Sequence, residues 1–147
     1  MSKKSVGKIL KLFISKKGIK DRIPKDKLEF DLNGVIDDKF HNKDILRSVL
    51  LASLDSYKLV KDNNIDINYG VLGENILIDF NPYRLDIGTQ LQIGNLTLEI
   101  SQECTICSHL SAINENLPTL LKKDRGIFTK VIQSGTVSIN DKIYLVD

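Results

Sequence analysis

The clearest structural signal in this sequence is the stretch Leu91-Gln92-Ile93-Gly94-Asn95-Leu96-Thr97-Leu98-Glu99-Ile100. On both sides of Gly94-Asn95, apolar residues alternate with polar residues at the two-residue period of a half-buried strand. A Gly-Asn pair between two such runs is typical of a tight β-hairpin turn. The stretch therefore predicts two antiparallel strands that each turn one face toward a core.

The same kind of pattern continues in both directions along the chain. Further strands are predicted near residues 6–14, 28–32, 76–80, 127–132, 137–139 and 143–146. Ser53 is suited to cap a helix that runs to about Lys61, and residues 104–123 are predicted to be partly helical with a break near Pro118. About seven short strands with two helices favour a mainly β, β-rich α+β fold that is barrel-like with peripheral helices. Because no repeat, low-complexity tract or linker interrupts residues 1–147, we expect one domain.

The charge is distributed unevenly. The 147 residues carry a net charge of +2, yet residues 1–27 hold ten basic and two acidic side chains. Such a segment is compatible with a transit peptide, a membrane-surface helix or a nucleic-acid arm. Its two-residue apolar period, closed by Gly18 and Pro24, instead favours a solvated strand and a lysine-rich turn. We expect a cytoplasmic protein that binds neither nucleic acid nor membrane, because the aromatic residues are few and no apolar stretch approaches the roughly 20 residues of a membrane span.

The segment with the most chemical potential is Gln102-Glu103-Cys104-Thr105-Ile106-Cys107-Ser108-His109, which holds both cysteines. A thioredoxin-like redox pair would need a βαβ context that the chain lacks, and haem attachment would need histidine where Ser108 stands. A zinc site would need four ligands, which Cys104, Cys107, His109 and the distant His41 would supply. From the spacing alone, two buried thiols without chemistry are the default expectation.

The four arginines, Arg22, Arg47, Arg84 and Arg125, are the second set of candidates. Arginine suits bidentate binding of phosphate or carboxylate, although a salt bridge to a neighbour such as Asp44 or Asp124 is the more ordinary role. The glycines of residues 70–75 do not form a phosphate-binding P-loop, since the Gly-Lys-Ser/Thr ending and a following helix are absent from the pattern.

Several segments, taken in order, resemble the MOSC domain, a family named for the C-terminal domain of molybdenum cofactor sulfurase. The resemblance covers residues 6–146 and rests on residues 34–41, 47–51, 73–76, 85–88, 91–94, 102–107 and 126–131, with Gly135 and Asp141. It implies a β-barrel-like fold with peripheral helices, which agrees with the strand pattern. The Cys-x-x-Cys segment followed by Gly126-Ile127-Phe128 is most similar to small stand-alone members.

The resemblance also implies a site. By position, Cys107 corresponds to the family cysteine that carries sulfur as a persulfide or binds molybdenum, and Cys104 is a second thiol that would resolve a persulfide as a disulfide. The resemblance places Asp38, His41, Arg47, Glu74 and Asn75 at motif positions around the expected cleft. Arg47 or Arg125 would bind the phosphate of molybdopterin, and His41 would donate a proton near neutral pH.

We therefore expect a molybdenum-cofactor-binding or sulfur-carrier protein that works with a partner. The partner implied is a PLP-dependent cysteine desulfurase or an enzyme that makes or accepts the cofactor, because the expected single domain carries no desulfurase domain of its own. The alternatives are a molybdenum-dependent reductase of N-oxygenated compounds, which in larger relatives carries an extra barrel domain, and a small zinc-stabilised binding module. Exposed apolar edges would be compatible with a homodimer.

Overall fold

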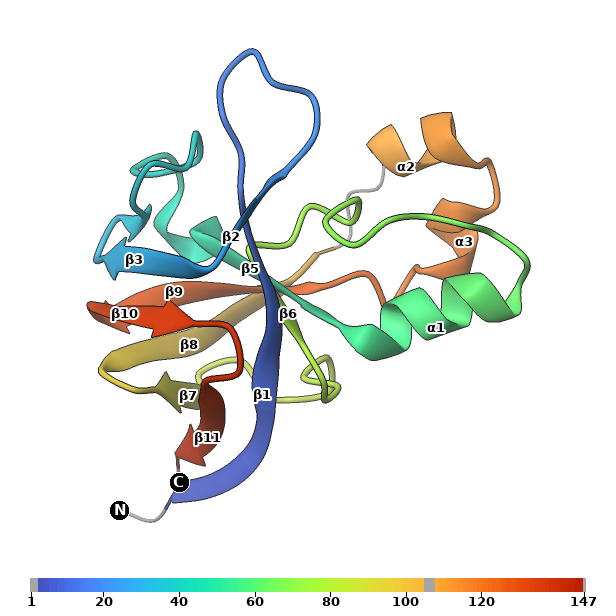
Figure 1. Ribbon diagram of the computed structural model, residues 1–147. Coiled ribbons are helices and arrows are strands. Elements are labelled where there is room, and N and C mark those ends of the chain that lie inside the picture. The colour runs from blue at the N-terminus through green and yellow to red at the C-terminus, as the bar shows by residue number, and fades with distance from the viewer. Residues whose placement is uncertain (1–2, 105–107, 147) are drawn as a thin grey trace.

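Seven strands close into a barrel in the computed structural model, which describes residues 3–104 and 108–146 (Figure 1). Around the barrel the order is β1, β11, β7, β8, β9, β5 and β6, and β6 pairs with β1 to complete the circuit. The bounds are β1 Lys3–Ile14, β5 Val49–Ser53, β6 Ile76–Ile78, β7 Gln90–Ile93, β8 Leu96–Glu103, β9 Ile127–Gln133 and β11 Lys142–Val146. The predicted mainly β, barrel-like fold is confirmed.

Strand β1 is the seam of the barrel. Its first half pairs with β11, and its second half lies between β6 and the short strand β2, Ile23–Lys25. The predicted N-terminal strand is therefore correct, but it is not simply solvated, because Ile9 and residues 12–14 are buried. Pro24 does not close this region off as expected: it lies inside β2 opposite Phe13, at the edge of the sheet, where a missing N–H group is tolerated.

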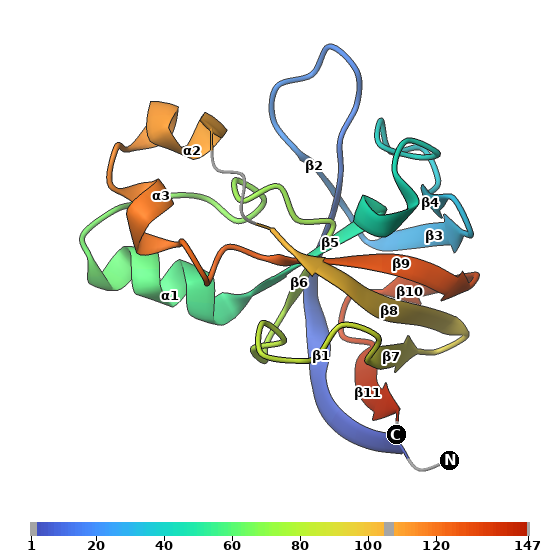
Figure 2. The ribbon, with the colours of Figure 1, turned by 180° about the vertical axis from the view of Figure 1, so that it is seen from behind.

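The hairpin predicted from residues 91–100 is present as β7 and β8. Ile93 pairs with Leu96 across the turn, and Gly94 has a φ of 59°, a value that favours glycine. Strand β8 continues beyond the hairpin and pairs along β9 (Figure 2). Glu103, its last residue, precedes Cys104, so the predicted chemical segment starts where a barrel strand ends.

A second, smaller sheet packs beside the barrel. It consists of β10 (Gly135–Ser138), β3 (Lys27–Asp31) and β4 (Gly34–Val35) in that order. Leu28, Phe30 and Val137 of this sheet belong to the same buried cluster as the barrel strands. Gly135, predicted to mark a turn, instead begins β10, and an added Cβ would lie 2.5 Å from the backbone nitrogen of Leu96.

The helices gather on one side of the barrel (Figure 2). They are α1 (Leu54–Asp62), α2 (Ser108–Ile113) and α3 (Leu117–Leu120). A 3-10 turn at Ile45–Arg47 lies apart from them, on the side of β3 and β4. Ser53 caps α1 as predicted, with its Oγ accepting from the Asp55 N–H at 3.1 Å. The predicted interruption near Pro118 is confirmed, since α2 ends at Ile113 and α3 begins at Leu117. Pro118 occupies the first turn of α3, where its missing N–H leaves no hydrogen bond unmade.

The helices cover a second buried cluster that includes Tyr57, Val60, Leu110 and Leu117. Across the described ranges 3–104 and 108–146, no helix has the length and apolar character needed to cross a membrane.

Candidate functional site

A cleft of about 900 Å³ is lined by residues of the β1–β2 loop and of α2. Figure 1 shows both of these segments at the top of the view. The loop after β4, the 3-10 turn and the loop before β6 complete its walls. Its lining includes Ser15, Lys20, Arg22, Lys39, Phe40, Lys43, Arg47, Ser48, Tyr69, Gly73, Asn75, Ala112, Ile113, Arg125 and Phe128. Three of the residues predicted from the sequence, Arg47, Asn75 and Arg125, therefore lie on one cavity.

The described lining of the cleft is strongly cationic. Its positive side chains are Lys20, Arg22, Lys39, Lys43, Arg47 and Arg125, and its acidic side chains are Asp21 and Asp44. A concave surface with an excess of positive charge concentrates its potential in the cavity and favours anionic ligands. The charge of this lining therefore favours a negatively charged ligand.

Arg125 is the deepest of these cations and links the cleft to a cysteine. Only 6% of the residue is exposed. Its Nη1 donates to the Cys104 sulfur at 2.6 Å, and its Nη2 donates to the Leu72 carbonyl at 3.1 Å. A positive charge against a sulfur stabilises the thiolate, which is the nucleophilic form of cysteine. Asp124, the salt-bridge alternative considered from the sequence, forms no ion pair with Arg125 among the described contacts.

Arg47 and Arg22 are held by aromatic rings rather than by carboxylates. The Arg47 guanidinium lies 4.7 Å from the ring centroid of Phe128, and that of Arg22 lies 5.7 Å from Phe40. Lys39 also approaches Phe40, at 5.0 Å. Contacts of this kind orient a cation while leaving its charge available to a ligand.

Glu74 lies behind the cleft wall and is completely buried. Its Oε2 accepts from the Tyr57 hydroxyl at 2.6 Å and from the Gly70 N–H at 3.3 Å, and its Oε1 has no hydrogen-bond partner among the described residues. Burial raises the pKa of this carboxyl, while the Tyr57 hydrogen bond and the charge of Arg22 act to lower it. Glu74 supports the wall and does not line the cavity.

Asn75 and Asp38 organise backbone around the cleft. The Asn75 side chain accepts from the Leu50 N–H at 3.1 Å and donates to the Phe13 carbonyl at 3.2 Å, so it joins β1 to β5. The buried Asp38 carboxylate accepts from the N–H groups of Ser15 and Phe40, at 2.6 and 3.0 Å. These two side chains hold the loops that carry the cations.

His41 lies apart from the described cleft lining. Its Nε2 is 2.7 Å from Oδ1 of Asp31, and both side chains are partly exposed. Although partial desolvation opposes it, the hydrogen bond from His41 lowers the pKa of Asp31. In this geometry His41 does not reach the cation cluster, and its role as a proton donor stays a prediction.

Cys107, the predicted thiolate and metal ligand, falls outside the described residues, as do Thr105 and Ile106. Before it in the chain, Cys104 contacts the lining residue Arg125. After it, Ile113 of α2 is itself part of the lining. Within the parts of the chain that are described, no three histidine, cysteine or acidic side chains form a group that would hold a metal ion. The zinc alternative, which needs Cys107 and His109, remains a prediction.

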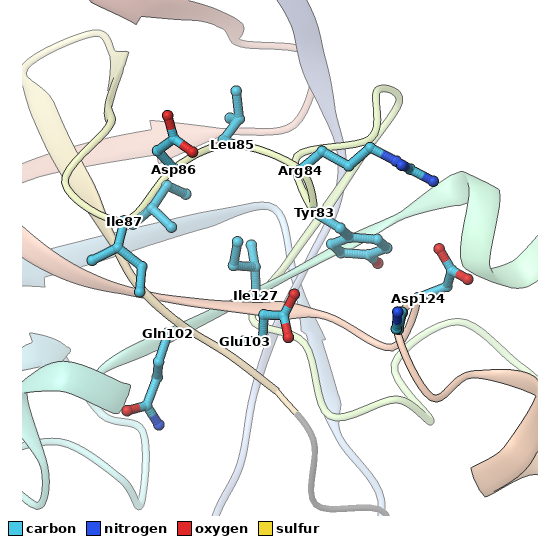
Figure 3. Close-up of a pocket in the computed structure, with 11 residues that line it drawn as sticks. Tyr83, Arg84, Leu85, Asp86, Ile87, Gln102, Glu103, Asp124 and Ile127 are labelled. Atoms are coloured by element: carbon cyan, nitrogen blue, oxygen red, sulfur yellow. The ribbon is translucent and has the colours of Figure 1, made fainter.

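A second cavity of about 750 Å³ lies between the β6–β7 connection and the start of β9. Figure 3 shows Tyr83, Glu103 and Asp124 around one part of it, with Asp86 and Ile87 toward the other edge. Arg84 and Lys123 are its described cations, so its charge is mixed. Unlike the first cavity, this one has no excess of positively charged side chains in its lining.

Comparison with known proteins gives the family. The MOSC domain family model matches residues 37–144, and the chain belongs to this family. The family is associated with molybdenum cofactor and with cofactor sulfurases. A search of curated proteins found no match.

Solved structures agree on the fold. The YuaD protein of Bacillus subtilis is 17% identical, with a TM-score of 0.83 over 98% of this chain and 97% of that one. YiiM of Geobacillus stearothermophilus is 16% identical, with a TM-score of 0.77 over 97% of this chain and 76% of its own. YiiM of Escherichia coli is 17% identical, with a TM-score of 0.71 over 95% and 70% of the two chains.

Sequence reasoning missed part of the cation cluster. Arg22 and Lys20 belong to the basic segment of residues 1–27, which was interpreted as a solvated strand and turn, and Lys39 and Lys43 follow the Asn33-Gly34 turn. The +8 charge of that segment was the available signal. What it did not reveal is that the β1–β2 loop brings Arg22 to the lining of the cavity, near Gly73.

Proposed function

We propose that this protein binds molybdenum cofactor, or relays sulfur to it, with Cys107 as the reactive thiolate. The observation that supports the proposal most is the cleft of about 900 Å³ with six cations in a chain of the MOSC family. Molybdopterin carries a phosphate, and guanidinium groups are the side chains best suited to hold phosphate through charge-assisted hydrogen bonds. The cleft chemistry therefore fits the cofactor associated with the family.

In this account the cleft residues bind and orient the cofactor, and Cys104 and Cys107 carry out the sulfur chemistry. Arg125, Arg47 and the surrounding lysines hold the anionic part of the cofactor. The bound cofactor would supply a molybdenum centre, for which a cysteine thiolate is a suitable soft ligand. Asn75 and Asp38 keep the loops in place through their backbone hydrogen bonds.

The sulfur-relay form of the proposal uses both cysteines. The Cys107 thiolate attacks the sulfane sulfur of a donor persulfide, and the donor cysteine leaves as a thiolate. The Cys104 thiolate then attacks the inner sulfur of the Cys107 persulfide, which forms a disulfide and releases hydrosulfide to the acceptor. Arg125 supports this second step because it stabilises the negative charge on the Cys104 sulfur. A PLP-dependent cysteine desulfurase is the partner that would supply the persulfide.

Transfer of cofactor to the purified protein tests the binding function. Protein free of cofactor is incubated anaerobically with molybdopterin released from a donor protein, and bound pterin is measured by fluorescence after gel filtration and oxidation. Arg47→Gln should bind about one tenth as much pterin as native protein, or less, because a charged hydrogen bond contributes about 1.5–3 kcal/mol to binding. Arg84→Gln, which makes the same charge change at the second cavity, should retain as much as the native protein. Equal loss in both variants would contradict a specific cleft site.

The reductase alternative draws on a different feature of the same cleft. Phe40 and Tyr69 line it with 44% and 47% of each residue exposed, which leaves apolar surface for an organic substrate next to the cations. A turnover assay with a hydroxylamine analogue and a reductant separates the two functions, because a carrier without catalytic activity gives no product.

A further inference from the structure

The backbone on both sides of Arg125 is held by hydrogen bonds. Before it, the carbonyl of Asp124 accepts from the hydroxyl of Ser56 in the first turn of α1. After it, the carbonyl of Gly126 accepts from the Cys104 N–H at 3.2 Å. An added Cβ at Gly126 would lie 3.1 Å from a backbone oxygen of β5, so this peptide is packed tightly against the barrel. The guanidinium that contacts the Cys104 sulfur is thus carried by a fixed segment of chain.

A chain of buried hydroxyl groups leads to the Asp124 carbonyl. Ser56 has one hydroxyl proton, which it donates to that carbonyl, so the 2.6 Å hydrogen bond between the hydroxyls of Ser56 and Tyr83 has Tyr83 as its donor. The Tyr83 oxygen in turn accepts from the Ser53 N–H at 2.7 Å. Burial raises the pKa of Tyr83, so its hydroxyl keeps the proton that it donates. The hydrogen bonds therefore run in one direction, from Tyr83 through Ser56 to Asp124.

This hydroxyl chain contacts neither the described lining of the cleft nor the Cys104 sulfur. Tyr83 and Asp124 line the second cavity, whereas Arg125 lines the cationic cleft. A hydrogen bond weakens steeply when its distance and angle depart from their preferred values, so the contact from Nη1 of Arg125 to the sulfur depends on where the backbone of Arg125 lies. The hydroxyl chain fixes that backbone from the side opposite to the cleft.

We propose that Tyr83 and Ser56 are positioning residues for Arg125. By fixing the Asp124 carbonyl they hold the guanidinium against the Cys104 sulfur, and the guanidinium stabilises the thiolate. The inference rests on the proposed function for what this thiolate does in sulfur relay, and on the hydrogen bonds for the positioning itself.

The amount of Cys104 thiolate in protein that carries Cys107→Ala tests the inference. Cys104 is then the one remaining cysteine, and ultraviolet absorbance measures its thiolate, with Cys104→Ser in the same protein as the blank. Arg125→Gln should lower the ratio of thiolate to thiol at least about tenfold. Ser56→Ala should lower it about threefold or more, because the loss of one neutral hydrogen bond displaces the guanidinium without removing its charge.

Thr129→Val is the matched control, since it also removes a buried hydroxyl that donates to a backbone carbonyl, that of Val49 at 3.2 Å. It should leave the thiolate ratio unchanged. An unchanged ratio in Ser56→Ala would overturn the inference, and so would an equal loss in Thr129→Val, which would mean that any weakening of the barrel lowers the ratio.

A double variant shows whether the effect passes through Arg125. Ser56→Ala added to Arg125→Gln should lower the ratio no further, and a second loss of the same size would overturn the inference. Circular dichroism shows whether each variant folds. If Ser56→Ala does not fold, Tyr83→Phe takes its place, because it removes the donor that orients the Ser56 hydroxyl; a native ratio in Tyr83→Phe would then overturn the inference.

These measurements need neither molybdenum nor persulfide, so they separate the two proposals. If Ser56→Ala lowers the ratio as expected but native protein takes up neither molybdopterin nor sulfur, the positioning role stands and the proposed function fails. If native protein relays sulfur while Ser56→Ala keeps the native ratio, the proposed function stands and the positioning role fails.

Discussion

Arg125 donates from Nη1 to the sulfur of Cys104 over 2.6 Å, and the same side chain lines the cationic cleft. The contact joins the end of β8 to the chain just before β9, the two barrel strands that pair along most of their length. A thiol and the ligand cavity therefore share one guanidinium group. A change in the charge of Cys104 therefore alters the electrostatic environment of the cleft through Arg125.

Replacement of Cys104 by alanine tests the resolving role of that thiol. After incubation with a persulfide donor, native protein should form the Cys104–Cys107 disulfide, and Cys104→Ala should accumulate a persulfide on Cys107 because no second thiol is present to attack it. Mass spectrometry of alkylated peptides distinguishes the two products. An identical product in both proteins would exclude Cys104 from the relay.

Arg125 should determine how readily that step occurs. Arg125→Gln removes the charge that stabilises the Cys104 thiolate, so we expect slower conversion of the Cys107 persulfide to the disulfide near neutral pH and a smaller deficit as the pH rises. Rapid-quench alkylation followed by mass spectrometry measures the rate. Conversion as fast as in native protein at every pH would mean that the contact has no role in the chemistry.

The buried Tyr83 hydroxyl should contribute measurably to stability. It accepts from the Ser53 N–H at 2.7 Å and shares a hydrogen bond with Ser56 Oγ at 2.6 Å. Tyr83→Phe leaves the buried Ser53 N–H without this partner, which should lower the free energy of unfolding by about 1–3 kcal/mol. Tyr144→Phe on β11 is the matched control and should change it by no more than about 0.5 kcal/mol. Urea denaturation gives both values, and equal values would contradict this role of the Tyr83 hydroxyl.

Glu74 should make stability depend on pH. Because burial raises its pKa in the folded state, the protonated form is favoured, and its contribution is full below the unfolded-state value near 4.5 and decreases as the pH rises through the folded pKa. Glu74→Gln cannot ionise, so its unfolding free energy should fall less than that of native protein from pH 4.5 upward. Asp86→Asn, at an exposed position of the second cavity, is the control. Parallel pH profiles for Glu74→Gln and native protein would refute the assignment.

The sequence predicted the parts of this fold that local patterns determine. The hairpin around Gly94-Asn95 and the helix capped by Ser53 are correct because a turn or a cap depends on neighbouring residues. The interruption near Pro118 is also correct, because a proline in a first helical turn is a local signal. The prediction that Pro24 closes off the N-terminal segment is wrong, because no local pattern shows that β2 is an edge strand, where proline is tolerated.

The residues of the candidate site were also predicted only in part. The family resemblance led to Arg47 and Asn75, and the chemistry of arginine led to Arg125. The barrel brings all three to one cavity. Arg22 was missed because its place in the cleft depends on a long-range approach between the β1–β2 loop and Gly73. His41 was expected at the cleft, and its pairing with Asp31 follows from the β3–β4 sheet and the loop after it.

Molybdenum and zinc analysis of protein purified anaerobically from a host that makes the cofactor tests the central proposal most directly. The account predicts near-stoichiometric molybdenum in the native protein and its loss in Cys107→Ala, with the fold retained by circular dichroism. Stoichiometric zinc without molybdenum would contradict the account and would assign Cys104, Cys107 and His109 to a structural metal site.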